Sequence, residues 1–270
     1  MNTLIASTSK AGCRASFAAR ISIGLLLACA STLACAQTPD PKAILSAMSQ
    51  YVAAQETIEV VFDSDIEVIT SDMEKLQFAS SGELKLHRPD KLYAHRVGGY
   101  ADVELFFDGK TADIYGKHLN AYAQVEIPGT VDQLVAALRD GHGIAVPGAD
   151  LLLSNSYEVL VADVLEAKYM GRGVIGGVEC EHLAFRNFDT DWQLWVEVGA
   201  KPIPRKLVIT SKTVNGAPQY TLRVTRWKSG HPLASGDFTF KVPAGATVLA
   251  PDALIDLDEL PQGAPSGGGK

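Results

Sequence analysis

The sequence has little cysteine, few aromatic residues and no long hydrophobic run. Four cysteines occur in 270 residues, and aromatic side chains make up 7% of the chain. No apolar stretch reaches the roughly 18 to 20 residues of a membrane-spanning helix, which argues against an integral membrane protein. Basic runs are also absent, and 24 Lys+Arg against 31 Asp+Glu give a net charge of −7. Nucleic acid is therefore not an expected partner.

The first 36 residues have the order of a secretory signal. The segment begins with basic residues and has no acidic ones, and an apolar run over 21–33 follows. It ends in Ala34-Cys35-Ala36, which is the small-x-small motif that signal peptidase cuts. We therefore expect residues 1–36 to be a signal peptide that is removed after Ala36, and a periplasmic mature protein. Lipid anchoring at Cys29 or Cys35 is the alternative, because each follows small or apolar residues.

The hydrophobic period is helical at first and then alternating. Asp40-Pro41 is a helix start signal, and the spacing after it predicts a helix over 41–55. Apolar residues then alternate with polar ones, which predicts an antiparallel sheet with one face in water. The expected strands of this first run are 57–69, 76–86, 93–97, 101–107, 111–115 and 121–126.

Helical spacing returns over 130–154 and predicts a helical insert that covers one face of the sheet. We expect strands to resume near residue 158 and to end with Phe238-Thr239-Phe240. Strands 166–174, 178–186, 205–213 and 218–227 are expected between these points, with another around Trp192. About eleven strands, one helix and one insert predict a single α+β domain over 37–258, followed by a disordered tail over 259–270.

One block of the sequence is characteristic of a known family. It contains GVECEHLAFR from Gly177, DWQLW from Asp191, PIPRKLVIT from Pro202 and PQY from Pro218. These motifs resemble a family of predicted periplasmic proteins known only as a domain of unknown function, and the resemblance covers about 40–250. The residues that carry it include Cys180, His182, Arg186, Trp192 and Arg205.

More distantly, the layout is similar to the LolA/LolB lipoprotein-carrier and RseB sensor superfamily. The shared features are the first helix, the hairpin Phe107-Asp108-Gly109-Lys110 and the closing Phe238-x-Phe240-x-Val242-Pro243. The resemblance implies a strongly curved antiparallel half-barrel, with helices over an apolar cavity on its concave face. LolA-type carriers latch this lid with an arginine on an early strand, but strand 57–69 has no arginine.

The apolar side of the first strands is the strongest candidate for binding a ligand. A curved sheet must hide this side against helices, and either a filled core or a pocket for an acyl chain would do so. The candidate cavity residues are Ile58, Val60, Phe62, Leu76, Phe78, Leu84, Leu86 and Trp195. Trp192 and Trp195 are three apart on a strand and should face opposite sides.

Cys180-x-His182 is the chief candidate for chemistry, because residues two apart on a strand share a face. A catalytic thiol needs a base within hydrogen-bond reach and a third orienting group, and a zinc site needs further ligands that the sequence does not place nearby. Packing in the sheet is the simpler interpretation. Arg186 and Arg205 could hold an anionic headgroup, but capping a strand edge is favoured. No metal or cofactor is expected.

These features predict an exported binding module without catalysis, whose ligand is a hydrophobic small molecule, an acyl chain or a lipidated protein. The alternative is an envelope sensor or scaffold that binds another periplasmic protein. A third hypothesis is an enzyme that uses Cys180 and His182.

Overall fold

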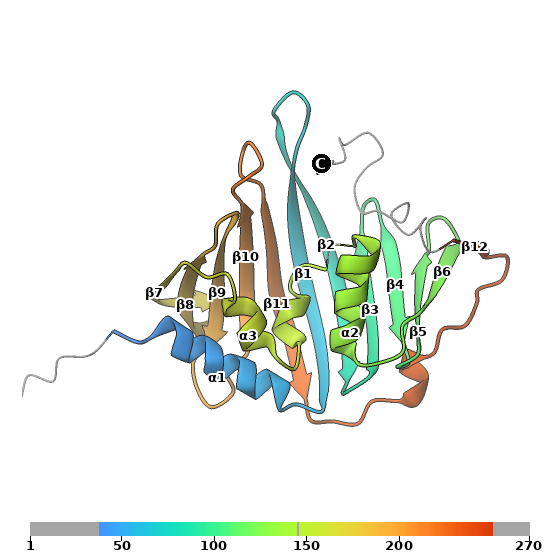
Figure 1. Ribbon diagram of the computed structural model, residues 1–270, viewed down its shortest axis with the longest axis horizontal. Helices are drawn as coiled ribbons and strands as arrows, with labels where there is room; N and C mark the ends of the chain where they lie inside the picture. The colour runs from blue at the N-terminus through green and yellow to red at the C-terminus, as the bar shows by residue number, and fades with distance from the viewer. Residues whose placement is uncertain (1–37, 145, 251–270) are drawn as a thin grey trace, which may run out of the picture. The chain divides into compact units, whose positions relative to one another are not determined.

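Twelve strands form one open sheet in the part of the chain that the computed structural model describes, residues 38–144 and 146–250. Their order across the sheet is β12-β6-β5-β4-β3-β2-β1-β11-β10-β9-β8-β7 (Figure 1). Neighbouring strands are antiparallel except β12, which runs parallel to β6. The curved α+β sheet expected from the sequence is confirmed, with twelve strands in place of about eleven.

The first half of the sheet follows helix α1 (Pro41–Ala53). The helix begins where the sequence predicts, because Asp40 accepts a hydrogen bond from the Lys42 backbone N–H at 3.0 Å and Pro41 has no N–H that needs a partner. The strands are β1 (Thr57–Ile69), β2 (Lys75–His87), β3 (Lys91–Gly98), β4 (Asp102–Phe107), β5 (Thr111–Gly116) and β6 (Ala121–Glu126).

The expected helical insert, residues 130–154, separates the two halves of the sheet. It contains α2 (Val131–Ala136), the π-helical turn η1 (Ala137–Gly141) and the 3-10 turn η2 (Ala149–Leu152). Thr130 and Gln133 cap each other's backbone N–H groups at the start of α2. Helix α3 (Ser156–Val161) follows the insert.

The second half of the sheet runs back towards the first. It consists of β7 (Glu166–Ile175), β8 (Val178–Arg186), β9 (Thr190–Glu197), β10 (Pro204–Ser211) and β11 (Gln219–Ser229). Strand β11 pairs with β1, with Tyr220 opposite Ile66 and Trp227 opposite Val60. The 3-10 turn η3 (Ser235–Phe238) and β12 (Thr247–Leu249) complete the described chain.

Helices α1, α2 and α3 pack on one face of the sheet (Figure 1). Helix α1 lies against β7, β8 and β9, and α2 lies over the first half of the sheet. Leu45, Met48 and Val52 of α1 have no exposed surface. Burying such side chains stabilises the fold by about 1.5 to 3 kcal/mol each as an upper estimate, so α1 is held by packing.

Two expected strands are wrong. Residues after Asn155 form α3 because Tyr157, Leu160 and Val161 meet the core at helical spacing, and the first strand after the insert is β7.

Residues 238–240 do not close the sheet either. Strand β11 lies between β1 and β10, so the chain that follows it finds no open edge until it reaches β6. On the way, Phe238 packs on His87 at 6.5 Å and Phe240 on Phe106 at 5.5 Å, measured between ring centroids. The alternation of apolar residues in this segment therefore comes from Phe238 and Phe240 packing on a face of the sheet, and not from pairing as a strand.

The predicted signal peptide with its cleavage site, the lipidation candidates Cys29 and Cys35, and the tail 259–270 lie outside the described residues. Within the described ones, no helix is long and apolar enough to cross a membrane.

Candidate functional site: an apolar cavity under the insert

A cavity of about 270 Å³ lies between the sheet and the insert. Strands β1 to β5, β10 and β11 supply one wall, and the insert supplies the other. Aliphatic and aromatic side chains dominate the lining, which includes Val60, Phe62, Leu84, Leu92, Ala94, Val103, Leu105, Ile114, Leu134, Leu138, Ile144, Leu151, Leu222, Val224 and Trp227. Its size is close to the lower end of small-molecule sites, about 300 Å³. We call this space the insert cavity.

The turn before η2 brings the insert close to β11. Gly148 has a φ of +87°, and a Cβ atom there would lie 3.2 Å from Cδ2 of Leu222. A side chain at this position would be strained and crowded, so glycine is required for the close approach. An ion pair joins the two ends of the insert's outer loop, with Arg139 Nη2 at 2.7 Å from Asp150 Oδ1.

Arg88 joins the insert to the end of α1. Its Nη2 donates to the Leu152 carbonyl oxygen at 2.6 Å, and its Nε donates to the Gln55 carbonyl oxygen at 3.2 Å. Burial lowers the pKa of Arg88, while the nearby Asp132 carboxylate acts in the opposite direction. Strand β1 has no arginine, as the sequence shows, but this arginine just after β2 does clamp the insert.

The structure places the eight predicted cavity residues in five different environments. Val60, Phe62 and Leu84 line the insert cavity, whereas Ile58 and Leu86 are fully buried in the filled core. Leu76 is 43% exposed. Phe78 borders a small separate pocket and meets Tyr100 edge-on. Trp195 does not line the cavity, because it stacks on His182 on the other face of the sheet.

Trp227 is a cavity residue that the alternation pattern misses. Tyr220, Leu222 and Val224 face the cavity in steps of two, which would turn Trp227 outwards. A β-bulge between β1 and β11 inserts one residue after Val224 and brings the indole back to the cavity side. Its Nε1 is buried and has no hydrogen-bond partner among the described residues.

One end of the cavity is polar. Arg96 and Tyr220 line it there and also border the small pocket, where Ser64 and Ser80 share a hydrogen bond of 2.8 Å. Burial raises the pKa of the Tyr220 hydroxyl, and the hydrogen bond with Ser64 and the charge of Arg96 act against this rise. The sequence pattern carries no signal for this end, because it depends on which strands become neighbours.

Cys180 and His182 share the face opposite the insert cavity but do not form a catalytic pair. The Cys180 side chain is fully buried, its Sγ donates weakly to the Val178 carbonyl oxygen, and burial raises the pKa of the thiol. His182 is held by Gln193 at 2.9 Å and by the Trp195 ring at 4.1 Å. A buried thiol with a raised pKa is a poor nucleophile.

The other residues of the characteristic block stabilise the second half of the sheet. Trp192 is buried on the helix side, stacks on Phe185 at 4.0 Å and donates to the Asn187 side chain. Trp195 faces the other way, so the two tryptophans lie on opposite faces as predicted. Arg186 pairs with Asp191 at 3.2 Å, and Arg205 pairs with Glu197 through its Nε at 2.8 Å. Both arginines therefore lie in ion pairs between strands.

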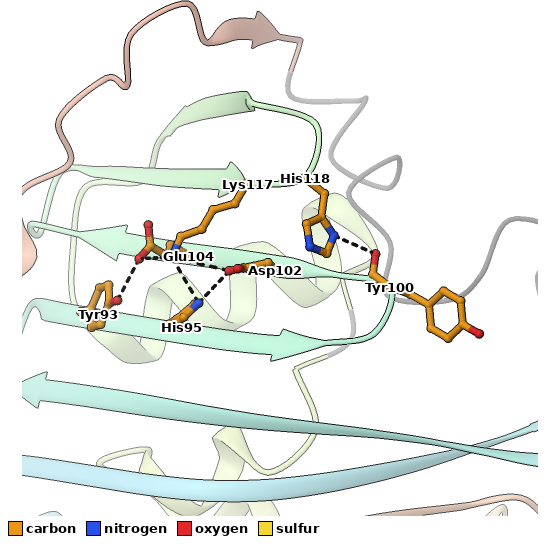
Figure 2. A network of polar contacts seen from close by, with 7 residues as sticks. All are labelled: Tyr93, His95, Tyr100, Asp102, Glu104, Lys117 and His118. Carbon is orange, nitrogen blue, oxygen red and sulfur yellow. Dashed lines mark hydrogen bonds and ion pairs between the residues drawn. The ribbon is translucent and has the colours of Figure 1, made fainter.

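A polar network links β3 and β4 to Lys117, the residue after β5, on the face turned away from α2 (Figure 2). Lys117 contacts Glu104 at 3.0 Å, and His95 contacts Asp102 at 2.7 Å. Burial alone would raise the pKa of Asp102, but the hydrogen bond with His95 and the charge of Lys117 lower it overall. Burial and the Glu104 carboxylate raise the pKa of Tyr93. The members satisfy one another, so the network ties β3 and β4 to the turn that follows β5.

No group of three or more His, Cys, Asp or Glu side chains that could hold a metal ion occurs in the described parts of the chain. The insert cavity, with its apolar walls and one polar end, is the feature best suited to bind a ligand.

Several solved structures are similar to the chain at low identity. An uncharacterized conserved protein from Thermus thermophilus is 11% identical, with a TM-score of 0.43, and the match covers 77% of this chain and 98% of that one. Mycobacterium tuberculosis lipoprotein LppX is 12% identical with a TM-score of 0.44, over 72% of this chain and 97% of LppX. MucB in the MucA/MucB complex of Pseudomonas aeruginosa is 12% identical with a TM-score of 0.43, and the match covers 75% of this chain and 62% of that one.

No curated protein matches the chain. The model of one family, described as predicted periplasmic protein (DUF2092), matches residues 41–250. This range includes the characteristic block, the insert and every cavity residue named above. The chain therefore belongs to the DUF2092 family of predicted periplasmic proteins.

Proposed function

We propose that the protein is an exported, non-catalytic binding module that holds a lipid acyl chain or a similar hydrophobic molecule in the insert cavity. The observation that carries the proposal is the cavity itself. A filled core would leave no such space between the sheet and the insert, since protein interiors contain few voids larger than a water molecule. Empty apolar cavities are destabilising unless something occupies them.

The sequence also supports export. The family is described as one of predicted periplasmic proteins, and residues 1–36 have the composition of a signal peptide. The intact mass of protein made from the full precursor tests this step. A mature chain that begins at Gln37 supports cleavage after Ala36. A chain that begins with an acylated Cys29 or Cys35 would instead show that the protein is anchored to a membrane by a lipid.

Native and denaturing masses of the same gently purified protein test the binding function. A lipid-sized excess that disappears on denaturation supports the proposal, and its mass identifies the ligand class. Displacement of a fluorescent fatty acid provides a second measurement. Absence of micromolar affinity for fatty acids, phospholipids and lipidated peptides would reject the proposal.

A pair of variants on β3 links binding to the cavity. Ala94 lines the cavity, whereas Val97 lies on the opposite face and is 41% exposed. We expect Ala94→Phe to fill the cavity and weaken binding of the probe at least about tenfold, equivalent to about 1.4 kcal/mol. Val97→Phe should leave binding unchanged. Equal effects of the two variants would place the ligand elsewhere.

A protein partner is the second candidate, and exposed apolar side chains near one sheet edge favour it. Leu165 directly precedes the edge strand β7, Met170 and Val174 lie in it, and Phe188 lies in the turn between β8 and β9. Their exposed fractions are 70%, 55%, 68% and 87%. Edge strands can add a strand from another protein. A periplasmic cross-link that Phe188→Ser abolishes while lipid binding persists would favour this function.

A further inference from the structure

The insert cavity is chemically asymmetric along β11. Arg96 is the one guanidinium in its described lining, which contains no Asp, Glu or Lys. Tyr220 lies near Arg96, and both continue into the small pocket with Ser64 and Ser80. Arg96 is already engaged within the protein, so an anion would join or replace that contact. One end of the cavity thus offers a positive charge and hydroxyl groups.

The other end is apolar and far away. Tyr220 lies opposite Ile66 and Trp227 opposite Val60, so the two positions are six residues apart along β1. At about 3.4 Å per residue this is about 20 Å. Leu222 and Val224 line the stretch between them. The volume of about 270 Å³ is at the lower end for small-molecule sites, so one extended chain suits it better than a two-chain ligand.

We propose, on the basis of the binding function above, that the ligand is a single-chain anionic amphiphile with its headgroup at Arg96 and Tyr220 and its chain directed towards Trp227. A carboxylate or a phosphate provides the acceptor oxygens that a guanidinium prefers.

The reverse orientation would place the headgroup against the indole N–H of Trp227, which has no hydrogen-bond partner among the described residues. That N–H is a single neutral donor. A charge-assisted hydrogen bond is about twice as strong as a neutral one. The headgroup therefore belongs at Arg96.

Three probes with the same chain and different headgroups test the orientation. Palmitate and hexadecyl phosphate are anionic, and hexadecanol is neutral. All are added below their aggregation concentrations, and each dissociation constant is measured by displacement of a fluorescent probe. We expect an anionic probe to bind about 10 to 100 times more tightly than hexadecanol, the range that one hydrogen bond to a charged group supplies. The better anion identifies the headgroup.

Variants separate the headgroup from the chain. Arg96→Gln should remove the advantage of the anions while the affinity for hexadecanol stays within about twofold, and Arg96→Lys should keep part of it. Arg139→Gln, on the outside of the insert, is the matched control for loss of one positive charge. Thermal unfolding of each variant verifies that it folds.

The outcomes distinguish this inference from the proposed function. If all three probes bind equally, the cavity binds a chain but the headgroup assignment is wrong. The assignment is also wrong if Arg96→Gln weakens all probes alike, or if Trp227→Phe abolishes the anion preference and Arg96→Gln does not. If no probe binds at micromolar concentration, the proposed function fails and the inference fails with it.

Discussion

Arg88 is the side chain whose removal should separate the insert from the rest of the fold. Its guanidinium makes two hydrogen bonds to backbone carbonyl oxygens, at 2.6 Å to Leu152 and 3.2 Å to Gln55. Hydrogen bonds to charged groups contribute about 1.5 to 3 kcal/mol each. The longer bond is the weaker one, and water can reach a half-buried site, so we take the lower end of the sum. Arg88→Ala should lower the free energy of unfolding by about 3 kcal/mol.

The matched control is Arg139→Ala. Arg139 also forms an ion pair in the insert, with Asp150, but on the surface with a side chain that is 42% exposed. Surface pairs contribute about 0 to 1 kcal/mol. Urea unfolding of the two variants at one pH therefore gives a difference of about 2 kcal/mol if the clamp acts as we describe.

Hydrogen exchange determines whether the loss is local. If Arg88 holds the insert, amides of residues 131–152 should lose protection in Arg88→Ala at urea concentrations where β9 and β10 keep theirs. Equal stabilities of the two arginine variants would refute the clamp. Uniform loss of protection in all strands would also contradict it, because the insert would then open only when the whole fold unfolds.

Three further outcomes follow from single positions. Gly148→Ala should destabilise the fold by about 1 to 2 kcal/mol because of its positive φ, whereas Gly141→Ala, which has open space around it, should be nearly neutral in thermal unfolding. Burial raises the pKa of Asp113, so ionisation of this carboxyl group opposes folding as the pH rises above about 4. Asp113→Asn should therefore stabilise the protein near pH 7 and not near pH 3. Urea unfolding midpoints at the two pH values measure this difference. The Cys180 thiol should react with a thiol reagent near pH 8 only after denaturation, and rapid reaction of the native protein would revive the enzyme hypothesis.

Local pattern was sufficient for the elements whose two faces differ in polarity. The first helix and strand β1 occur where the spacing of apolar residues predicts them. Helix α3 was missed because a six-residue helix has too few turns to show its period. Residues 238–240 alternate like a strand because they pack on an aromatic layer of the sheet, and alternation does not reveal whether a ladder partner is present.

The cavity depends on contacts that the chain makes only when folded. Ile58 and Val60 lie two apart on the same side of β1, yet one is in the filled core and the other at the cavity. Alternation assigns a residue to a face of the sheet but cannot distinguish these two places along it. The position of the insert decides between them, and the bulge in β11 decides the side of Trp227. A period of two could not predict either feature.

Most of the block that characterises the family lies in a different part of the sheet from the cavity. The motifs from Gly177 to Thr210 lie on β8, β9 and β10, where Trp192 and Phe185 pack beneath α1. Of the described cavity wall, these three motifs supply only Pro204, and the last motif of the block, PQY, supplies Tyr220. The remaining wall comes from β1 to β5, β11 and the insert. Substitutions in Trp192 should therefore reduce stability with little change in ligand preference, while substitutions in Arg96 or Leu222 should change ligand preference at nearly constant stability.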